Sequence, residues 1–555
     1  MRIVRWDLAL RALLVVPALA AIGLGPLDNP TLAGAACLAA LLILLCDFRR
    51  PNAAAYLITG IACAVATALG SLTLPALVTV ALVVVLSATL GVVKGFGGFA
   101  GVASVTVVAE LLIAVGLRAG GAAPVSVLVG VVVGCTVSVV VAVLLPAPRQ
   151  TLLVLTADLR QSYARALRGE TVPADGSHAL VRAYVQATDR PQAPDRASAD
   201  ALHRLSSLAR LGDLLQVPFD VDDFTLASSR VLLGGPAPGP EPDTAWQRQV
   251  AYAVGVIADP RPAPAGEWLR QLRVRLQPDA LLFVQGSVAA ALYGSLTAMV
   301  LLLTPPHPQW ILLGAVTATY PYARRAAIVV RNLLVGTVLA FVGLLLVAPL
   351  ADAHPVAWWV VFLVAVAVAC AVPHSTRGWI AGQVAFTSLS LSLLALAVGR
   401  LPAEAIVIRF ENVIIGGTAA IVVALVLAPR HMRQRLQRAL ASLYDVAGEP
   451  DLDLRRAQFL RCVDVIDSMR GSGYVGVERL TRWLDAARNV VQVGVIQVLL
   501  SVDDGGHARR CAAALRRNQA VPSYAGDQAD LDAVFEAARE DLQDLSPLRQ
   551  RTELM

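Results

Sequence analysis

Long apolar stretches recur in two parts of the chain, and each has about the length of a membrane-spanning helix. A helix needs roughly 20 mostly apolar residues to cross the hydrocarbon core of a bilayer. Six such stretches lie near residues 8–26, 31–46, 55–71, 74–93, 98–117 and 124–145, and six more lie near 280–303, 308–323, 330–350, 356–373, 378–398 and 409–428. This pattern predicts an all-α, polytopic membrane protein with two sets of six transmembrane helices.

A polar segment follows each set of apolar stretches. In the first segment, the heptad-like spacing of Leu152, Leu155, Leu159 and Tyr163 indicates soluble helices, and the proline-rich residues 236–240 and 260–264 are typical of linkers. The second segment has a helical pattern that breaks at residues 471–473. We therefore expect two parallel repeats, each with six spans and a cytoplasmic helical domain. The expected boundaries are 1–149, 150–278, 279–429 and 430–555.

Composition supports a membrane protein and excludes other classes. The chain of 555 residues is 57% hydrophobic and 15% charged, whereas a soluble domain is about 45–50% apolar and about 25% charged. An ordinary soluble enzyme and a disordered chain are both disfavoured. The net charge of +6 reflects an arginine-rich composition in which Lys94 is the one lysine, so we infer no nucleic-acid partner from it. The seven cysteines show no spacing typical of a metal site.

Basic residues in the short loops predict the orientation, because such residues gather on the cytoplasmic side of a membrane. They fall mainly on one side of the predicted spans, at Arg2, Arg5, Arg49, Arg50, Lys94, Arg149, Arg324, Arg325, Arg377, Arg430, Arg433 and Arg435. We expect both termini and both soluble domains in the cytoplasm, in a multi-pass protein of the plasma (inner) membrane. Ala18-Leu19-Ala20 is similar to a signal-peptidase site, but cleavage there would break the charge alternation, so we expect the first span to be retained.

No motif for catalysis or nucleotide binding is present in the sequence. The chain has no phosphate-binding loop, no HExxH and no GxSxG, and Gly95-Phe96-Gly97-Gly98 reads best as a flexible start to the fifth span. We therefore expect neither an enzyme nor a bound cofactor or metal, and no ATP-driven pumping by this chain alone.

Polar residues inside the spans are the first candidates for function, since they are costly in lipid. Glu110 lies deep in the fifth span, one turn after Thr106. Desolvation disfavours the charged form of a buried carboxylate, which suits proton uptake and release; a structural hydrogen bond to a neighbouring helix is the equal alternative. Gln383 and Thr387 belong to a polar stretch in the eleventh span, continued by Ser388, Ser390 and Ser392. This stretch either lines a path or bonds helices together.

Arginines and aromatic residues in the second set of spans suggest an anion site. Arg409 and Glu411 open the twelfth predicted span, and Arg331 starts the ninth. A guanidinium binds a carboxylate with two parallel hydrogen bonds, so both arginines are candidates, although Arg331 also suits a place at the cytoplasmic interface. Tyr320 and Tyr322 flank a proline within the short eighth span, where they either stack on a substrate ring or belong to an interfacial aromatic belt.

The second half of the chain resembles the fusaric acid resistance family, which includes aromatic acid exporters and is related to aluminium-activated malate transporters. The resemblance rests on His307, Pro308 and Trp310, then Arg324 and Arg325, Arg331, and Gly336 and Thr337, and it continues at Arg409, Gly416, Gly417 and Pro429. Arg331 lies five residues before Gly336, a looser spacing than is usual in the family, and Ala340 stands where a second glycine is often found. The first half keeps only Asn29-Pro30-Thr31-Leu32 in place of the His-Pro-x-Trp motif.

This resemblance implies a proton-coupled exporter of small aromatic or other organic carboxylic acids. Two alternatives stay open: a passive organic-anion channel, and a non-transporting membrane scaffold, which predicts no polar path between the two sets of spans. The expected partners are the lipid bilayer and a small organic anion. Spans rich in glycine and alanine permit a homodimer, and nothing in the sequence indicates an adaptor protein.

Overall fold

The computed structural model describes two compact units of the chain. The described residues are 6–46, 53–94, 98–145, 223–232, 281–320, 323–371, 376–427, 432–447, 506–517, 519–524 and 529–542, with isolated positions between them. The first unit joins residues 1–149 to residues 284–428, and the second joins residues 150–283 to residues 429–555. Both predicted sets of apolar stretches therefore belong to one unit. The predicted four-domain boundaries stay a prediction.

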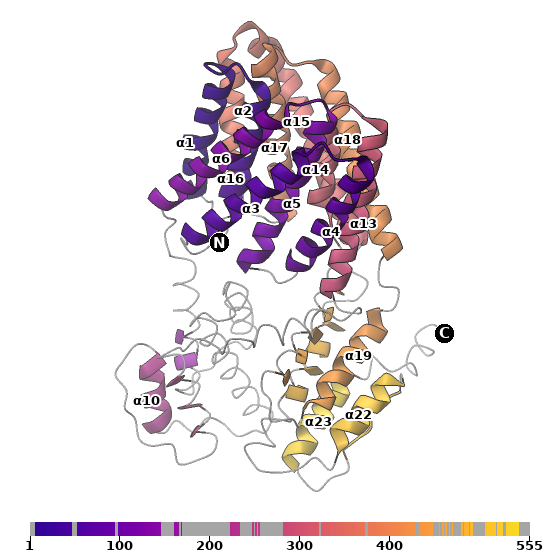
Figure 1. The fold of residues 1–555 in the computed structure, drawn as a ribbon. Helices are drawn as coiled ribbons and strands as arrows, with labels where there is room; N and C mark the ends of the chain where they lie inside the picture. Colours follow the sequence, from indigo (N-terminus) through magenta and orange to yellow (C-terminus); the bar gives the residue numbers. More distant parts are fainter. Residues whose placement is uncertain are drawn as a thin grey trace. The chain divides into compact units, whose positions relative to one another are not determined.

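All the elements assigned in the first unit are α-helices (Figure 1). The N-terminal half contributes α1 (Trp6–Leu24), α2 (Pro30–Leu45), α3 (Ala53–Ser71), α4 (Ala76–Lys94), α5 (Gly98–Ala119) and α6 (Pro124–Leu144). The other half contributes α13 (Leu281–Leu303), α14 (Pro308–Ala318), α15 (Ala323–Ala353), α16 (Val356–Ala371), α17 (Thr376–Val398) and α18 (Ala403–Leu427). Within the described residues, seven of these helices are long and apolar enough to cross a membrane: α3, α4, α6, α13, α15, α17 and α18. The all-α, multi-span prediction is confirmed, and the arrangement as two repeats stays a prediction.

The helices of the two halves pack against one another inside this unit. In the first half, α2 packs on α1 and α6, and α3 packs on α5 and α6. In the second half, α15 packs on α17 and α18, and α14 packs on α18. Contacts between α5 and α14, and between α1 and α16, join the halves. One apolar core, which includes Leu111, Leu112, Ile311 and Leu312, runs across both.

Glycines allow two of these helix pairs to approach closely. A Cβ atom on Gly336 of α15 would lie 2.8 Å from the Ile380 carbonyl oxygen of α17. A Cβ atom on Gly416 of α18 would overlap with the Ile311 carbonyl oxygen of α14. Because helix association in lipid depends on packing rather than on the hydrophobic effect, small residues at such contacts contribute directly to cohesion.

Three helices begin or end at positions different from those expected. The short α14 has 11 residues and ends at Ala318. Helix α15 begins at Ala323 and α18 begins at Ala403, so Arg331 and Arg409 lie inside their helices rather than at the start. The expected spans followed apolar runs, which stop at a charged residue, whereas backbone hydrogen bonding continues through such a residue.

The second unit is also helical where the structure describes it. It contains α10 (Asp223–Leu232), α19 (Met432–Asp445), α22 (His507–Arg516) and α23 (Ala529–Asp541). Helix α19 packs on α22, supported by a salt bridge between Arg516 and Asp445. The rings of Tyr444 in α19 and Phe535 in α23 stack on one another. The predicted leucine positions 152, 155 and 159, the two proline-rich segments and the break at 471–473 lie outside the described residues.

Candidate functional site

A cavity of about 360 Å³ lies between the N-terminal and the C-terminal helices of the first unit, which holds the candidate membrane spans. Its walls come from helices of both halves, and most of its lining is apolar. The polar and aromatic side chains that line it are Lys94 of α4, Thr106 of α5, Thr317 of α14, Tyr320 after α14, Gln383 and Phe386 of α17, and Arg409 of α18. A mostly apolar cavity of this size with a few converging polar groups is typical of a small-molecule site.

Arg409 is the main charged group of this cavity. Its side chain is 2% exposed, and its Nε and Nη1 atoms have no hydrogen-bond partner in the part of the chain that the structure describes. The guanidinium carbon lies 5.3 Å from the centre of the Trp310 ring, in cation–π geometry. A buried guanidinium that keeps free donors is costly, and an anion in the cavity would satisfy it.

Trp310 is held by the His-Pro turn that begins α14. Pro308 occupies the first turn of the helix, where a missing backbone N–H costs no hydrogen bond. The backbone N–H of Trp310 donates to the His307 carbonyl oxygen at 2.9 Å. The His307 and Trp310 rings stack with their centroids 4.4 Å apart. Asn412 of α18 donates from Nδ2 to the carbonyl oxygens of Pro306 and His307, at 3.1 and 3.2 Å. The family-like motif therefore places an aromatic ring beside Arg409.

The Gly336-Thr337 pair supports Gln383 on another wall. Gly336 lets α17 approach, and Gln383 then donates from Nε2 to the hydroxyl oxygens of Thr337 at 3.1 Å and Thr387 at 3.2 Å. Gln383 of the polar stretch in α17 thus bonds to α15 and also lines the cavity, and the prediction that the stretch lines a transport path stays a prediction. The hydroxyls of Ser390 and Ser392 donate to carbonyl oxygens of their own helix.

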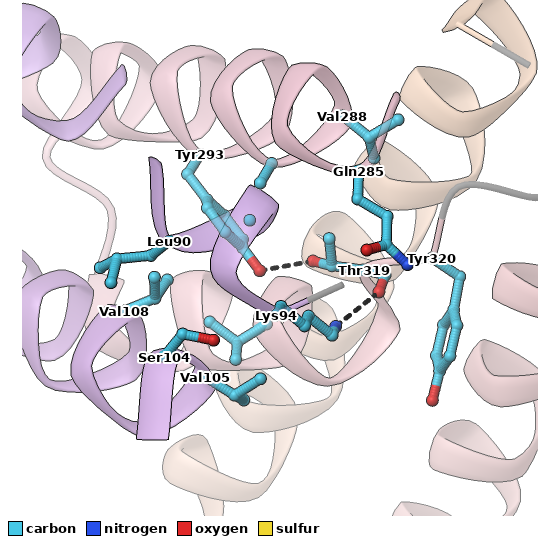
Figure 2. Close-up of a pocket in the computed structure, with 13 residues that line it drawn as sticks. Leu90, Lys94, Ser104, Val105, Val108, Gln285, Val288, Tyr293, Thr319 and Tyr320 are labelled. Carbon is cyan, nitrogen blue, oxygen red and sulfur yellow. Dashed lines mark hydrogen bonds between the residues drawn. The ribbon is translucent and has the colours of Figure 1, made fainter. Parts of the chain in front are cut away.

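Lys94 lies at the wall that joins this cavity to a smaller one of about 90 Å³. Figure 2 shows its ammonium pointing at the Thr319 carbonyl oxygen, 3.2 Å away, while the Tyr293 hydroxyl meets the Thr319 hydroxyl at 2.6 Å. The Lys94 Nζ atom also lies 5.5 Å from the centre of the Tyr320 ring. The position of Lys94 in a short loop predicted only the orientation of the spans. The signal that could have singled it out is that Lys94 is the one lysine of the chain.

Glu110 follows Ala109 of α5, which lines the cavity, but is not itself among the lining residues. Its side chain is 1% exposed, and Oε1 has no hydrogen-bond partner among the described residues. Thr106, one turn earlier, lines the cavity and contacts the Cys46 thiol at 3.1 Å. Glu110 is therefore one helical turn from a cavity-lining residue.

The remaining predicted residues divide into those near the cavity and those outside it. Arg331 and Glu411 are exposed on α15 and α18, where neither lines the cavity, and Arg331 Nη2 donates to the Asn332 side chain at 3.4 Å. Arg324 and Arg325 are exposed in the first turn of α15, with Arg325 placed 5.3 Å from the Tyr320 ring. Tyr322 lies outside the described residues. Across the described chain, no group of three or more His, Cys, Asp or Glu side chains is placed to hold a metal ion.

A second, larger cavity of about 740 Å³ reaches the other end of α14. Its lining includes Pro306 and His307, before the helix, and Gly120, after α5. The 360 Å³ cavity instead reaches Tyr320, beyond the C-terminus of α14. Leu313 and Phe386 line both cavities, so the two meet near these side chains.

One comparison with known proteins identifies part of the chain. Residues 290–423 match a protein family described as fusaric acid resistance protein-like. The matched residues include all of α14, α15, α16 and α17, with the His-Pro-x-Trp motif, Gln383 and Arg409. No curated protein and no solved structure matches the chain. The chain is therefore a multi-span membrane protein with a fusaric acid resistance protein-like domain at residues 290–423, consistent with a transporter.

Proposed function

We propose that the protein is a secondary exporter of small aromatic or other organic carboxylic acids, driven by the proton gradient across the plasma membrane. The observation that carries this proposal is the buried Arg409 guanidinium of the 360 Å³ cavity, whose Nε and Nη1 atoms have no hydrogen-bond partner among the described residues. A guanidinium presents paired donors that match the two oxygens of a carboxylate. An organic acid is therefore the ligand that this group fits best.

The surroundings of Arg409 favour an aromatic acid. Phe386 and Tyr320 line the same cavity, and the Trp310 ring lies against the guanidinium. Aromatic rings pack on one another in stacked or edge-to-face arrangements that favour a ring-bearing ligand over a compact polar anion. A carboxylate on Arg409 would leave the ring of such a ligand among these side chains.

The arrangement of the two cavities supports a carrier over the alternatives. The cavities reach opposite ends of α14 and share Leu313 and Phe386 in their linings, and we propose that these apolar side chains form the barrier between them. A carrier needs such a barrier between its two access routes, whereas an open channel needs a continuous path. A scaffold needs neither cavity, and both lie among helices of the two halves.

Orientation and proton coupling complete the proposal. The end of the unit with Lys94, Arg324 and Arg325 faces the cytoplasm, so the 360 Å³ cavity is the route from the inside. Glu110 carries the coupled proton, supported by its burial and its place one turn from Thr106. A reporter at the C-terminus that reacts with an impermeant reagent in intact cells would contradict this orientation.

Flux measurements in proteoliposomes test the role of Arg409. Benzoate flux driven by a pH gradient is compared for wild type, Arg409→Gln and Arg409→Lys, with Arg400→Gln as a control that removes an exposed arginine. A hydrogen bond to a charged group contributes about 1.5–3 kcal/mol, so we expect KM for benzoate to rise roughly 10- to 100-fold in Arg409→Gln and less in Arg409→Lys. The control should match wild type. Wild-type KM and flux in folded Arg409→Gln would overturn the proposal.

A further inference from the structure

Two cations from different halves of the chain line the same cavity. Lys94 is the last residue of α4, Arg409 lies in α18, and both line the 360 Å³ cavity. The described lining of this cavity contains no aspartate or glutamate. Neither Lys94 nor Arg409 forms an ion pair with an acidic side chain in the described part of the chain. Without a ligand, the cavity therefore holds two positive charges that no carboxylate of its lining balances.

Two uncompensated charges in a low-dielectric cavity repel one another and lose hydration. One monoanion balances only one of them. We propose that the cavity selects small aromatic dianions, acids that carry two carboxylates, with Arg409 and Lys94 as the two charge contacts. This inference rests on the proposed function, since it names the substrate class of the same site.

The geometry of Lys94 leaves donors for a ligand. An ammonium carries three N–H donors, and at Lys94 one is directed to the Thr319 carbonyl oxygen at 3.2 Å. The Nζ atom lies 5.5 Å from the Tyr320 ring, which also lines the cavity. A carboxylate held there would meet an ammonium already fixed in place by Thr319, and its aromatic ring would lie near Tyr320 and Phe386.

The competing explanation is that Lys94 is only structural. Thr319 is the C-cap residue of α14, and a cation near the last carbonyls of a helix is stabilising without any ligand. The two roles respond differently to substitution. Glutamine keeps an N–H donor for the Thr319 carbonyl and removes the charge, whereas arginine keeps the charge. A structural role therefore tolerates Lys94→Gln, and a role in dianion selection does not.

Binding measurements on the purified full chain separate these roles. Affinities for benzoate and for the three benzenedicarboxylates are measured with wild type, Lys94→Gln, Lys94→Arg and Arg409→Gln. We expect wild type to bind at least one dicarboxylate about 10-fold more tightly than benzoate, the equivalent of about 1.4 kcal/mol. Lys94→Gln should lose this preference, because its affinity for the dicarboxylate falls by more than its affinity for benzoate, and Lys94→Arg should keep part of the preference.

The other outcomes are distinguishable. An unchanged dicarboxylate preference in Lys94→Gln, or no such preference in wild type, overturns the dianion proposal and leaves the carboxylate site at Arg409 intact. Benzoate affinity unchanged in Arg409→Gln overturns the proposed function itself.

Chemical modification gives an independent test, because Lys94 is the one lysine of the chain. Trinitrobenzenesulfonate reacts with amines, and the amines of this chain are Lys94 and the terminal amino group, which peptide mapping tells apart. We expect a saturating dicarboxylate to slow the modification of Lys94 severalfold, with benzoate having less effect and the terminal amine serving as the reference. Equal Lys94 rates with and without dicarboxylate would exclude Lys94 from the site.

Discussion

Asn412 of α18 donates from its side-chain amide to the His307 carbonyl oxygen, 3.2 Å away, and to the Pro306 carbonyl oxygen at 3.1 Å. Arg409 lies three residues earlier in the same helix. One turn of α18 therefore supplies the guanidinium and also fixes the turn whose Trp310 ring lies against it. His307 has a left-handed backbone, with φ 49°, which few residues other than glycine adopt. The hydrogen bonds from Asn412 stabilise this conformation.

Replacing Asn412 should therefore damage both stability and binding. Asn412→Leu keeps the approximate volume and removes both hydrogen bonds, for a loss of about 1–3 kcal/mol. Asn412→Asp keeps the shape but has no N–H to donate, so we expect it to be at least as harmful. The measurements are the thermal unfolding midpoint in detergent and KM for benzoate, which should rise as Trp310 and Arg409 shift. Wild-type values for both variants would show that Asn412 does not position the turn.

Sequence patterns identified the helices and the polar residues in them, but not the direction in which each residue faces. Arg409, Gln383 and Thr387 stood out because a polar group in an apolar helix is rare. In a soluble helix the polar face shows which side is buried; in lipid both sides are apolar. In α15, Leu344 is 3% exposed and Leu346 is 77% exposed, although the residues are identical.

The same ambiguity explains why sequence patterns did not tell which of these residues line the cavity. Arg331 and Arg409 are both arginines inside apolar helices, yet the first is exposed and the second is buried in the cavity wall. Lys94 ends a helix as a topology marker would, and only the neighbouring Thr319 and Tyr320 show that it also lines the cavity. Asn412 acts on a loop about a hundred residues earlier in the chain, a relationship that no local pattern contains.

Close helix packing at Gly416 should be sensitive to a single added methyl group. In Gly416→Ala the new Cβ overlaps with the Ile311 carbonyl oxygen and lies 3.0 Å from the Ala315 nitrogen, both backbone atoms that cannot move without shifting α14. Overpacking of this kind costs about 1–3 kcal/mol. Gly343→Ala is the matched control, since its Cβ would have no neighbour within 4 Å. We expect a lower unfolding midpoint in the first variant and an unchanged or higher one in the second; equal midpoints would contradict the predicted overlap.

Phe386 should limit the passive passage of substrate between the 360 Å³ cavity and the 740 Å³ cavity. Its ring lines both cavities, so Phe386→Ala widens their junction. We expect benzoate to run down its own gradient in proteoliposomes several times faster than in wild type when no proton gradient is present. Leu393→Ala is the control, because Leu393 lines the 740 Å³ cavity and does not line the 360 Å³ cavity. Rapid passive flux already in wild type would favour the channel alternative.

Glu110 should matter for coupling more than for binding. Glu110→Gln keeps the shape of the side chain and removes its titration, so we expect benzoate affinity to stay within about twofold. Benzoate accumulation driven by a pH gradient should fall to the level reached without one. Thr67→Val is the control for loss of a polar group from the N-terminal half of the first unit. It removes a buried hydroxyl that has no hydrogen-bond partner among the described residues. Gradient-driven accumulation at the wild-type level in Glu110→Gln would reject the proton role.

His307 predicts a pH dependence of stability at the start of α14. Partial burial lowers the pKa of His307 below its ordinary value of about 6.5. The unfolded chain therefore binds a proton more readily than the folded protein, and this contribution to stability is lost as pH falls below about 6.5. His307→Asn removes the titration and keeps a residue type that tolerates the left-handed backbone. The unfolding midpoint of wild type relative to His307→Asn should decrease between pH 7.5 and pH 5, and a constant difference would show that His307 titrates normally in the folded protein.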